Sequence, residues 1–299
     1  MIEKVDVKCG FLCNNRCLFC VQGNKRTQIG DIPTPDIIQT LEKARSEAHS
    51  VVLTGGEVTI KPDFLQLVNK AGELGFRHIQ IQTNGRMFAI NDFCDKTIRA
   101  GANDFSVALH GHTPALHDYL TQSKGAFYQT VKGIKNLKKR GQRVGLNIVV
   151  NRSNFRNLPS IAALAIRLQV DQYQFAFVHA LGTAGKNFSR IVPRYTLIEP
   201  YVKKGLSLGI LAGKSVMTEA IPYCMMSGYY PYVAERIIPK TKIYDVGVID
   251  DYTDYRVKEG KLKGEHCTVC RFNAVCEGPW KEYSERYGFF EFRPVLNPA

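Results

Sequence analysis

Two groups of cysteines are the residues of this sequence whose types and spacing point most directly to chemistry. The chain has 299 residues and nine cysteines. Four lie within residues 9–20 and three within residues 267–276, while Cys94 and Cys224 stand alone. The N-terminal segment has no apolar signal region. Clustered thiols in such a chain indicate metal ligation rather than disulfides, so we expect a cytoplasmic metalloprotein.

The first group contains Cys13, Cys17 and Cys20, with Cys-x3-Cys-x2-Cys spacing. A loop with this spacing can bend three thiolates around one face of a [4Fe–4S] cluster, which leaves the fourth iron without a protein ligand. Zinc is the alternative if Cys9 supplies a fourth thiolate. Cys9 lies on or beside the first expected strand, however, and can equally face inward as a small apolar residue.

The segment Cys13-Asn-Asn-Arg-Cys17-Leu-Phe-Cys20 resembles the signature loop of the radical S-adenosylmethionine (SAM) superfamily. The aromatic Phe19 before the third cysteine is part of the resemblance, which implies that this side chain lies near the adenine. The resemblance also implies that the open iron chelates SAM, and that reductive cleavage then gives a 5′-deoxyadenosyl radical that abstracts hydrogen. The cofactor supplies this chemistry, and the protein orients the reactants and excludes water.

Three further segments resemble the family in the same chain order. Gly55-Gly56-Glu57 matches a Gly-Gly-Glu motif whose glycines allow close backbone approach and whose acidic and backbone groups hold the methionyl ammonium. Thr83-Asn84-Gly85 and the stretch from Ser106 to Gly111 match the ends of the next two strands, although relatives often carry Asp where this chain has His110. The cofactor-binding residues that the resemblance implies are Phe19, Gly55, Gly56, Glu57, Asn84, Ser106, Asn147 and Asn151.

The second cysteine group, Cys267-x2-Cys270-x5-Cys276, resembles part of the SPASM domain and the shorter twitch domain, which bind auxiliary clusters. Trp280 stands where a further cysteine is expected in that pattern. With Cys224 these cysteines make four ligands, enough for one auxiliary [4Fe–4S] cluster. Zinc also suits four thiolates. If Cys224 is instead an apolar core residue, the auxiliary cluster keeps an open iron.

The remaining candidates for chemistry are less specific. His110, His179 and Tyr223 are candidate catalytic residues, and a hydrogen-bonded histidine or a packed tyrosine is the structural alternative for each. Arg190, Arg194 and Glu219 are candidate lining residues for a substrate cavity. Cys94 is expected to lie on a helix and to be inert.

Six β–α units must position these motifs. The expected strands are 5–7, 51–54, 78–83, 104–109, 143–150 and 171–178, and the expected helices are 34–49, 61–74, 92–100, 127–140, 157–168 and 200–208. Alternation of this kind predicts parallel strands and right-handed crossovers, hence a partial (β/α)6 TIM-type barrel. The motifs all follow strands, so they share the rim at the strands' carboxyl ends. Residues 1–210 are predicted as this core and 211–299 as a small auxiliary-cluster domain.

The charge and the resemblance together limit the functions that we expect. The net charge of +13 is spread along the chain, and no segment is long and apolar enough to span a membrane. We expect reduced flavodoxin or ferredoxin as electron donor and no partnership with nucleic acid or membrane. The resemblance implies oxidation or cross-linking of a peptide side chain, which we favour, or dehydrogenation of a small polar metabolite. The alternatives are an RNA-modifying enzyme and a non-enzymatic zinc-binding or redox-sensing protein.

Overall fold

The computed structural model describes residues 2–297, and a single nine-stranded sheet forms its centre. The strand order is β7-β6-β5-β4-β3-β2-β1-β8-β9. Neighbouring strands are parallel except for β8 and β9. The strands are β1 (Lys4–Lys8), β2 (Ser50–Thr54), β3 (His78–Thr83), β4 (Asp104–Ala108), β5 (Arg143–Val150), β6 (Gln172–Phe177), β7 (Ser215–Glu219), β8 (Thr241–Tyr244) and β9 (Val248–Ile249). With β7 and β9 at its edges, this sheet is an open, partial barrel, as predicted.

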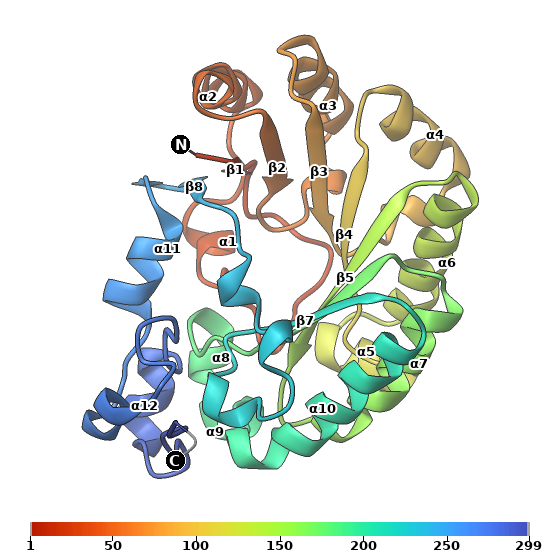
Figure 1. Cartoon of the computed structure of the whole chain (residues 1–299). Coiled ribbons are helices and arrows are strands. Elements are labelled where there is room, and N and C mark those ends of the chain that lie inside the picture. Colours follow the sequence, from red (N-terminus) through yellow and green to blue (C-terminus); the bar gives the residue numbers. More distant parts are fainter. Residues whose placement is uncertain (1, 298–299) are drawn as a thin grey trace.

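Helices cover the outer face of the curved sheet (Figure 1). The α-helices of residues 2–297 are α1 (Lys25–Gln28), α2 (Thr34–Glu47), α3 (Phe64–Glu73), α4 (Asn91–Arg99), α5 (Pro114–Thr121), α6 (Ala126–Lys139), α7 (Leu158–Arg167), α8 (Gly182–Lys186), α9 (Phe188–Ile191), α10 (Tyr195–Leu211), α11 (Tyr252–Tyr255) and α12 (Lys281–Tyr287), of which α11 and α12 lie at one side in the C-terminal region. Among residues 2–297, no helix combines the length and apolar character needed to cross a bilayer.

The core lies between these helices and the convex face of the sheet. In β5, Val144, Leu146, Ile148 and Val150 are buried and alternate with less buried residues. Because successive strand side chains point to opposite faces, the apolar set packs under α6 and α7 while the other set faces the inside of the barrel. Left-handed glycines after α3, α4 and α6 end those helices, at φ +84° (Gly75), +113° (Gly101) and +70° (Gly141).

The prediction for α10 was wrong at its start. The helix begins at Tyr195 rather than Pro200, and Pro200 lies inside it. Pro200 lacks only the N–H that would reach back to residue 196, near the helix start. Burial of Tyr195 and Ile198 against the core stabilises that first turn, which proline would otherwise weaken. Helix α5 was not predicted.

Residues beyond 210 also contribute to the sheet. β7 continues it beyond β6, and β8 pairs in parallel with the other side of β1, with Asp6 opposite Ile243. Strand β8 was not predicted, because four residues within a segment rich in Tyr, Gly, Pro and Asp carry too little pattern. The division into 1–210 and 211–299 stays a prediction, and the structure adds that both parts share one sheet.

Candidate functional site

Cys13, Cys17 and Cys20 lie in the loop between β1 and α1, all three partly buried and none in a disulfide. Their thiols are neighbours. Burial raises the pKa of Cys17 above its ordinary value, and the nearby thiols of Cys20 and Cys13 raise it further. The backbone N–H of Asn15 donates to Cys13 Sγ at 3.3 Å. As thiolates these three side chains would repel one another, so their convergence in one loop, with a backbone donor on one of them, fits binding to the cationic core of an iron–sulfur cluster.

Two arginines hold the backbone of this loop. Arg26 donates through one nitrogen to the carbonyl oxygens of Cys13, at 2.9 Å, and Asn15. Arg86, which follows β3, donates to the carbonyl of Asn14 at 2.6 Å and to Asn15 Oδ1 at 2.8 Å. The loop conformation therefore depends on side chains from two other segments. Neither arginine was predicted to contact this loop, because an isolated arginine has no sequence pattern that indicates its hydrogen-bond acceptor.

The glycines of the Gly55-Gly56-Glu57 segment lie directly against the cysteine loop. Gly55 has φ +141°, and a Cβ there would collide with the carbonyl oxygen of Gly10, while one on Gly56 would collide with that of Leu12. The N–H groups of Gly56 and Glu57 donate to those same carbonyls at 2.9 and 2.8 Å. Only glycine permits this approach, so the motif fixes the base of the loop.

The Glu57 carboxylate is 3% exposed and is surrounded by donors. It accepts hydrogen bonds from the Asn84 N–H (2.5 Å), the Thr83 hydroxyl (2.6 Å) and both the hydroxyl (2.5 Å) and N–H (3.3 Å) of Thr59. Burial raises the pKa of Glu57, and these donors lower it in part. The carboxylate thus joins the ends of β2 and β3. Contact of Glu57 with a methionyl ammonium stays a prediction.

Asn84 extends this connection to the cysteine loop. Its side-chain amide donates to Asn14 Oδ1 at 2.6 Å and its Oδ1 accepts from the Arg86 N–H at 3.0 Å.

Phe19 is buried, and its ring packs edge to face with the His110 ring, with centroids 4.7 Å apart. The structure therefore gathers the predicted residues Cys13–Cys20, Gly55–Glu57, Asn84 and His110 at one rim.

His110 is a buried, uncharged histidine. Its Nδ1 accepts from the Val149 N–H at 3.2 Å, so the proton of the neutral ring lies on Nε2. Burial, and then the neighbouring His117, lower the pKa of His110 to about 3. A group so far from titration near neutral pH is better suited to fix Phe19 than to exchange protons.

Ser106 and Asn147 lie on the inward faces of β4 and β5 rather than on the rim loops. Ser106 lines the cavity inside the barrel. Asn147 Oδ1 accepts from Gln174 Nε2 at 3.3 Å. Asn151 is fully buried, and its side chain bonds the backbone of its own loop. A ribose or carboxylate contact for these three stays a prediction.

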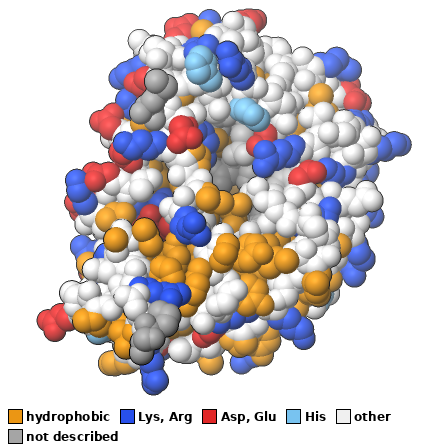
Figure 2. Space-filling model, in the orientation of Figure 1, with side chains coloured by type: hydrophobic (Ala, Val, Ile, Leu, Met, Phe, Trp, Pro, Cys, Tyr) orange, Lys and Arg blue, Asp and Glu red, His pale blue; other side chains and the backbone are white. Residues whose placement is uncertain are grey.

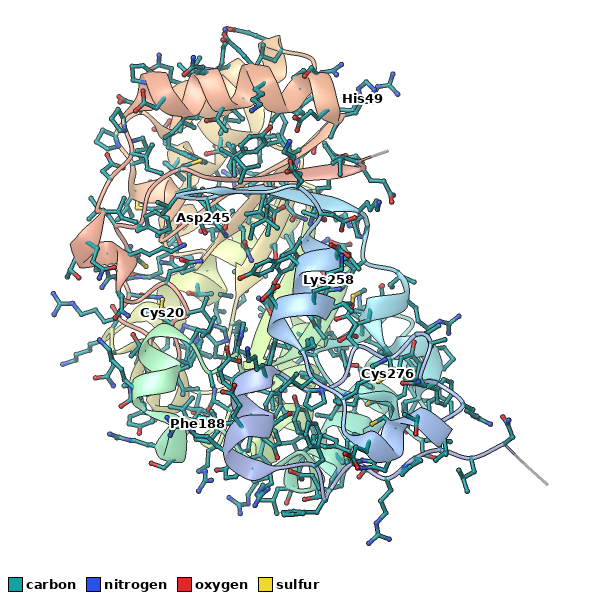
Figure 3. The ribbon with its side chains drawn as sticks, turned by 90° about the vertical axis from the view of Figure 1, so that its left-hand side faces the viewer. Cys20, His49, Phe188, Asp245, Lys258 and Cys276 are labelled. Atoms are coloured by element: carbon teal, nitrogen blue, oxygen red, sulfur yellow. The ribbon has the colours of Figure 1, made fainter. Side chains whose placement is uncertain are left out.

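Four cysteines line a second, apolar pocket in the C-terminal region: Cys224, Cys267, Cys270 and Cys276. Burial raises the pKa of Cys224 to about 12, and the other three thiols add to the shift. Cys270 Sγ accepts a hydrogen bond from the Val295 N–H at 3.4 Å. Burial raises the pKa of Cys276, and hydrogen bonds from the backbone at Tyr223 and Gly278 lower it in part. Convergent thiols with backbone donors, next to Lys263 and Arg293, fit a negatively charged thiolate cluster. Cys20 and Cys276 lie well apart (Figure 3).

Tyr223 lies in this second region, and His179, which follows the carboxyl end of β6 at the rim, contacts it through Trp280. Tyr223 lines the four-cysteine pocket and stacks on Phe272 at 4.6 Å. His179 stacks on Trp280 at 3.8 Å, and its Nε2 lies 3.2 Å from Glu282 Oε2. Trp280 therefore fills with an aromatic stack the position where the resemblance leads one to expect a further cysteine.

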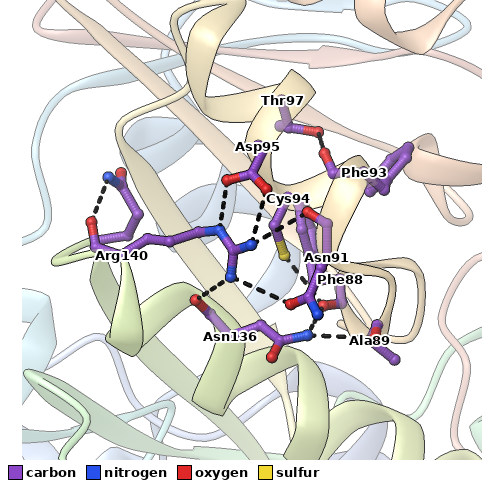
Figure 4. A network of polar contacts seen from close by, with 10 residues as sticks. Phe88, Ala89, Asn91, Phe93, Cys94, Asp95, Thr97, Asn136 and Arg140 are labelled. Atoms are coloured by element: carbon purple, nitrogen blue, oxygen red, sulfur yellow. Dashed lines mark hydrogen bonds and ion pairs between the residues drawn. The ribbon is translucent and has the colours of Figure 1, made fainter.

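The thiols of the other two cysteines are not grouped with either set of cysteines. Cys9 is 3% exposed in the core, and burial raises its pKa to about 12. Cys94 is fully buried on α4, where its thiol donates to the Phe88 carbonyl at 3.1 Å beside the Arg140–Asp95 ion pair (Figure 4). Among residues 2–297, no group of three or more His, Cys, Asp or Glu side chains surrounds a point suited to one metal ion. That finding concerns single ions, since a cubane cluster spreads its ligands farther apart.

Comparison with known proteins decides the family. A sequence profile described as the Radical SAM superfamily matches residues 7–164, more than half of the chain. The chain belongs to the radical SAM superfamily. Membership of this superfamily implies that the protein binds a [4Fe–4S] cluster and SAM. The matched region contains Cys13, Cys17, Cys20 and the Gly55–Glu57 and Asn84 segments described above.

Among relatives of this radical SAM chain, the "Probable GTP 3',8-cyclase" of Sulfurisphaera tokodaii is 30% identical over 207 residues, which cover 68% of the chain and 64% of the relative. The chain thus spans less than two thirds of the length of such relatives. Streptococcus suis SuiB bound to precursor peptide SuiA has a similar fold, with a TM-score of 0.69, 14% identity and coverage of 99% of this chain and 75% of SuiB. Native anSMEcpe with bound AdoMet and Cp18Cys peptide has a similar fold with a TM-score of 0.66 and 13% identity. That match covers 98% of this chain and 97% of anSMEcpe.

Proposed function

We propose that this radical SAM enzyme uses Cys13, Cys17 and Cys20 to hold the [4Fe–4S] cluster that binds SAM. The observation that carries the proposal is the convergence of these three thiols in a loop braced by Arg26, Arg86, Asn84 and the Gly55–Glu57 segment. When bound, the cluster and SAM supply, with one electron from a donor, a 5′-deoxyadenosyl radical that takes a hydrogen atom from substrate.

The chain's own residues set the geometry for that step. Gly55 and Gly56 leave a backbone surface without side chains next to the cysteine loop. Glu57 and Asn84 hold the ends of β2 and β3 in register with the loop. Phe19, backed by His110, gives an apolar wall next to Cys20 that excludes water from the adenine side.

Cys224, Cys267, Cys270 and Cys276 are proposed to hold one auxiliary [4Fe–4S] cluster. Their common apolar pocket supports this assignment. Held there, the cluster would supply a one-electron acceptor for a substrate radical, and loss of that electron together with a proton would make the net reaction an oxidation of the substrate. Zinc is the alternative that metal analysis tests, but among the described residues these four cysteines do not surround a point suited to a single ion.

The substrate is proposed to be a peptide side chain or a small polar metabolite, with reduced flavodoxin or ferredoxin as electron donor and the cytoplasm as location. Two peptide-bound radical SAM structures share the fold, and the named relatives add GTP as a competing substrate class. Nothing in the described contacts points to RNA.

Anaerobic reconstitution with Cys17→Ala tests the central assignment. The variant is expected to lose the iron of the first cluster and to form no 5′-deoxyadenosine from SAM and a strong reductant. Cys94→Ala is the matched control, since Cys94 packs on α4, and it is expected to match the parent protein in both respects. Formation of 5′-deoxyadenosine by Cys17→Ala at the parental rate would overturn the assignment, as would a colourless zinc-loaded parent.

A further inference from the structure

Three segments of the chain meet at the cysteine loop, and we call their common surface the basic face. They are the loop with α1, the end of α5 with the turn after it, and the stretch that contains α8, namely residues 12–29, 119–124 and 181–190. The Thr183 N–H donates to the Cys20 carbonyl at 2.9 Å, and the Leu18 N–H donates to the Leu120 carbonyl at 3.0 Å. The second and third segments therefore both rest on the loop itself.

At Gly182 the third segment comes closest to a proposed cluster ligand. This glycine has φ +54°, and a Cβ there would collide with the carbonyl oxygens of Cys20 and Val21. Val21 and Leu181, on either side of this contact, are 42% and 43% exposed. Figure 3 shows Cys20 on the side of the molecule away from His49. Apolar side chains thus lie at the surface on that side, directly beside the loop that would hold the first cluster.

The charged residues of the basic face all have the same sign. Its three segments contain no Asp or Glu, although the whole chain has 27 of them. Lys25 pairs with Asp245 at 2.6 Å, and Arg26 donates to the backbone of the loop. The other cations are exposed and form no ion pair within residues 2–297: Arg16, Lys124, Lys186 and Arg190.

Neutral groups hold two of these exposed cations in place. Lys186 donates to Asn24 Oδ1 at 2.8 Å, and Arg190 donates to the Tyr119 hydroxyl at 2.7 Å. Each bond joins two different segments of the basic face and leaves the positive charge unneutralised. The opposite side of the molecule differs, since Figure 2, viewed from the side of His49, shows Asp and Glu side chains interspersed with Lys and Arg.

We infer that the basic face is the docking surface for an acidic protein that carries single electrons. Electron transfer between proteins slows steeply with distance, so a donor has to dock where the loop that holds the first cluster reaches the surface. Exposed apolar side chains bordered by charge are typical of protein interfaces, and opposite charges on the two partners speed their encounter. The inference rests on the proposed function for the cluster, and it deepens that function by locating the donor.

The exposed apolar side chains favour a protein over a nucleic acid as the partner. Single-stranded nucleic acids are held by cations along their phosphates and by aromatic rings that stack on their bases. Val21 and Leu181 are aliphatic and can do neither. Removal of their exposed surface from water stabilises a complex with another protein.

A pair of charge reversals in the reconstituted protein tests the inference. The double variant Lys124→Glu, Lys186→Glu changes two segments of the basic face and no proposed ligand. With an acidic flavodoxin, reduced photochemically and kept below saturation, it should form 5′-deoxyadenosine about tenfold more slowly than the parent. With dithionite, which is too small to need a docking surface, it should match the parent. The matched control reverses two exposed lysines of α6, Lys135→Glu and Lys139→Glu, and should match the parent with both reductants.

Two further measurements separate docking from the reaction. Added salt should slow the parent more than the double variant when flavodoxin is the donor, because salt screens charges at the surface. Titration with oxidised flavodoxin measures docking alone, so it tests the basic face even in a protein that does not cleave SAM. A parent that forms no 5′-deoxyadenosine with dithionite but binds flavodoxin through this face would contradict the proposed function and not this inference.

Three results would overturn the inference. The first is a double variant that binds flavodoxin and reacts with it as the parent does. The second is an equal loss in the α6 control. The third is a parent that reacts with dithionite but with neither reduced flavodoxin nor reduced ferredoxin. Retention of RNA by the parent and not by the double variant, with the flavodoxin-driven rate unchanged, would assign the face to nucleic acid instead.

Discussion

The carboxylate of Glu57 accepts a hydrogen bond of 2.5 Å from the backbone N–H of Asn84, which joins the end of β2 to the end of β3. Asn84 in turn donates from its side chain to Asn14 in the cysteine loop. Two motifs that resemble separate SAM contacts are thus one continuous network of hydrogen bonds. Each segment of the rim thus supplies a hydrogen-bond partner of the next.

Replacement of Glu57 by Gln is expected to weaken this network. A glutamine keeps the shape but turns its amide NH2 group toward donors, so a buried N–H or hydroxyl loses its acceptor, at a cost of about 1–3 kcal/mol in the free energy of unfolding. Chemical denaturation of the apoprotein measures that loss, and iron content after reconstitution measures the effect on the first cluster. Glu73→Gln, exposed on α3, serves as control. Equal stability of the two variants would contradict the network's importance.

Arg26 donates hydrogen bonds to the backbone of the cysteine loop and also places a positive charge near its three thiols. Arg26→Gln should reduce iron incorporation, because the carbonyls of Cys13 and Asn15 lose their donor. It should also make the reduction potential of the first cluster more negative, on the order of tens of millivolts, because a nearby positive charge favours the reduced cluster. Redox titration monitored by electron paramagnetic resonance measures the shift. The exposed Arg16, in the same loop, provides the control Arg16→Gln, which should leave the potential unchanged.

Buried histidines should make the stability depend on pH. Burial lowers the pKa of His110 from its ordinary 6.5 to about 3, and that of His117 to about 4. Between these values and 6.5 the unfolded chain holds more protons than the folded one. Stability therefore rises with pH across this window, by up to about 1.4 kcal/mol per pH unit for each histidine.

His110→Gln isolates one of these two contributions. Glutamine can still accept from the Val149 N–H, but it takes up no proton on unfolding. Urea unfolding of the apoprotein at several values below pH 6.5 should give a shallower rise of stability with pH in this variant. His78→Gln, at an exposed position, should keep the parental slope. Identical slopes for His110→Gln and the parent would show that His110 does not carry the effect.

The two cysteine groups should be separable by iron content. Cys267→Ala is expected to lower iron from about eight to about four per chain, while SAM cleavage continues, since Cys267 is remote from the first loop. Loss of both clusters together would contradict independent sites. Cys224→Ala adds a second outcome: if Cys224 is a ligand, its variant matches Cys267→Ala, and if it only packs, the auxiliary iron remains.

The sequence determined the superfamily, the parallel α/β class and the order of the rim motifs. Local signals carry all three: thiol spacing, glycines where backbones must approach, and alternation of apolar runs. The helices ended by Gly75, Gly101 and Gly141 could be predicted because a left-handed turn is a property of one residue. The start of α10 could not, because burial of Tyr195 outweighs the preference of Pro200.

Only the tertiary structure decided how the motifs support one another. Arg26 and Arg86 reach the cysteine loop from other segments, and β8 joins β1 from more than two hundred residues away. The same holds for the basic face, whose three segments meet only because the fold packs two of them onto the cysteine loop. Such contacts depend on distances between segments far apart in the chain, and spacing within a motif carries no information about them.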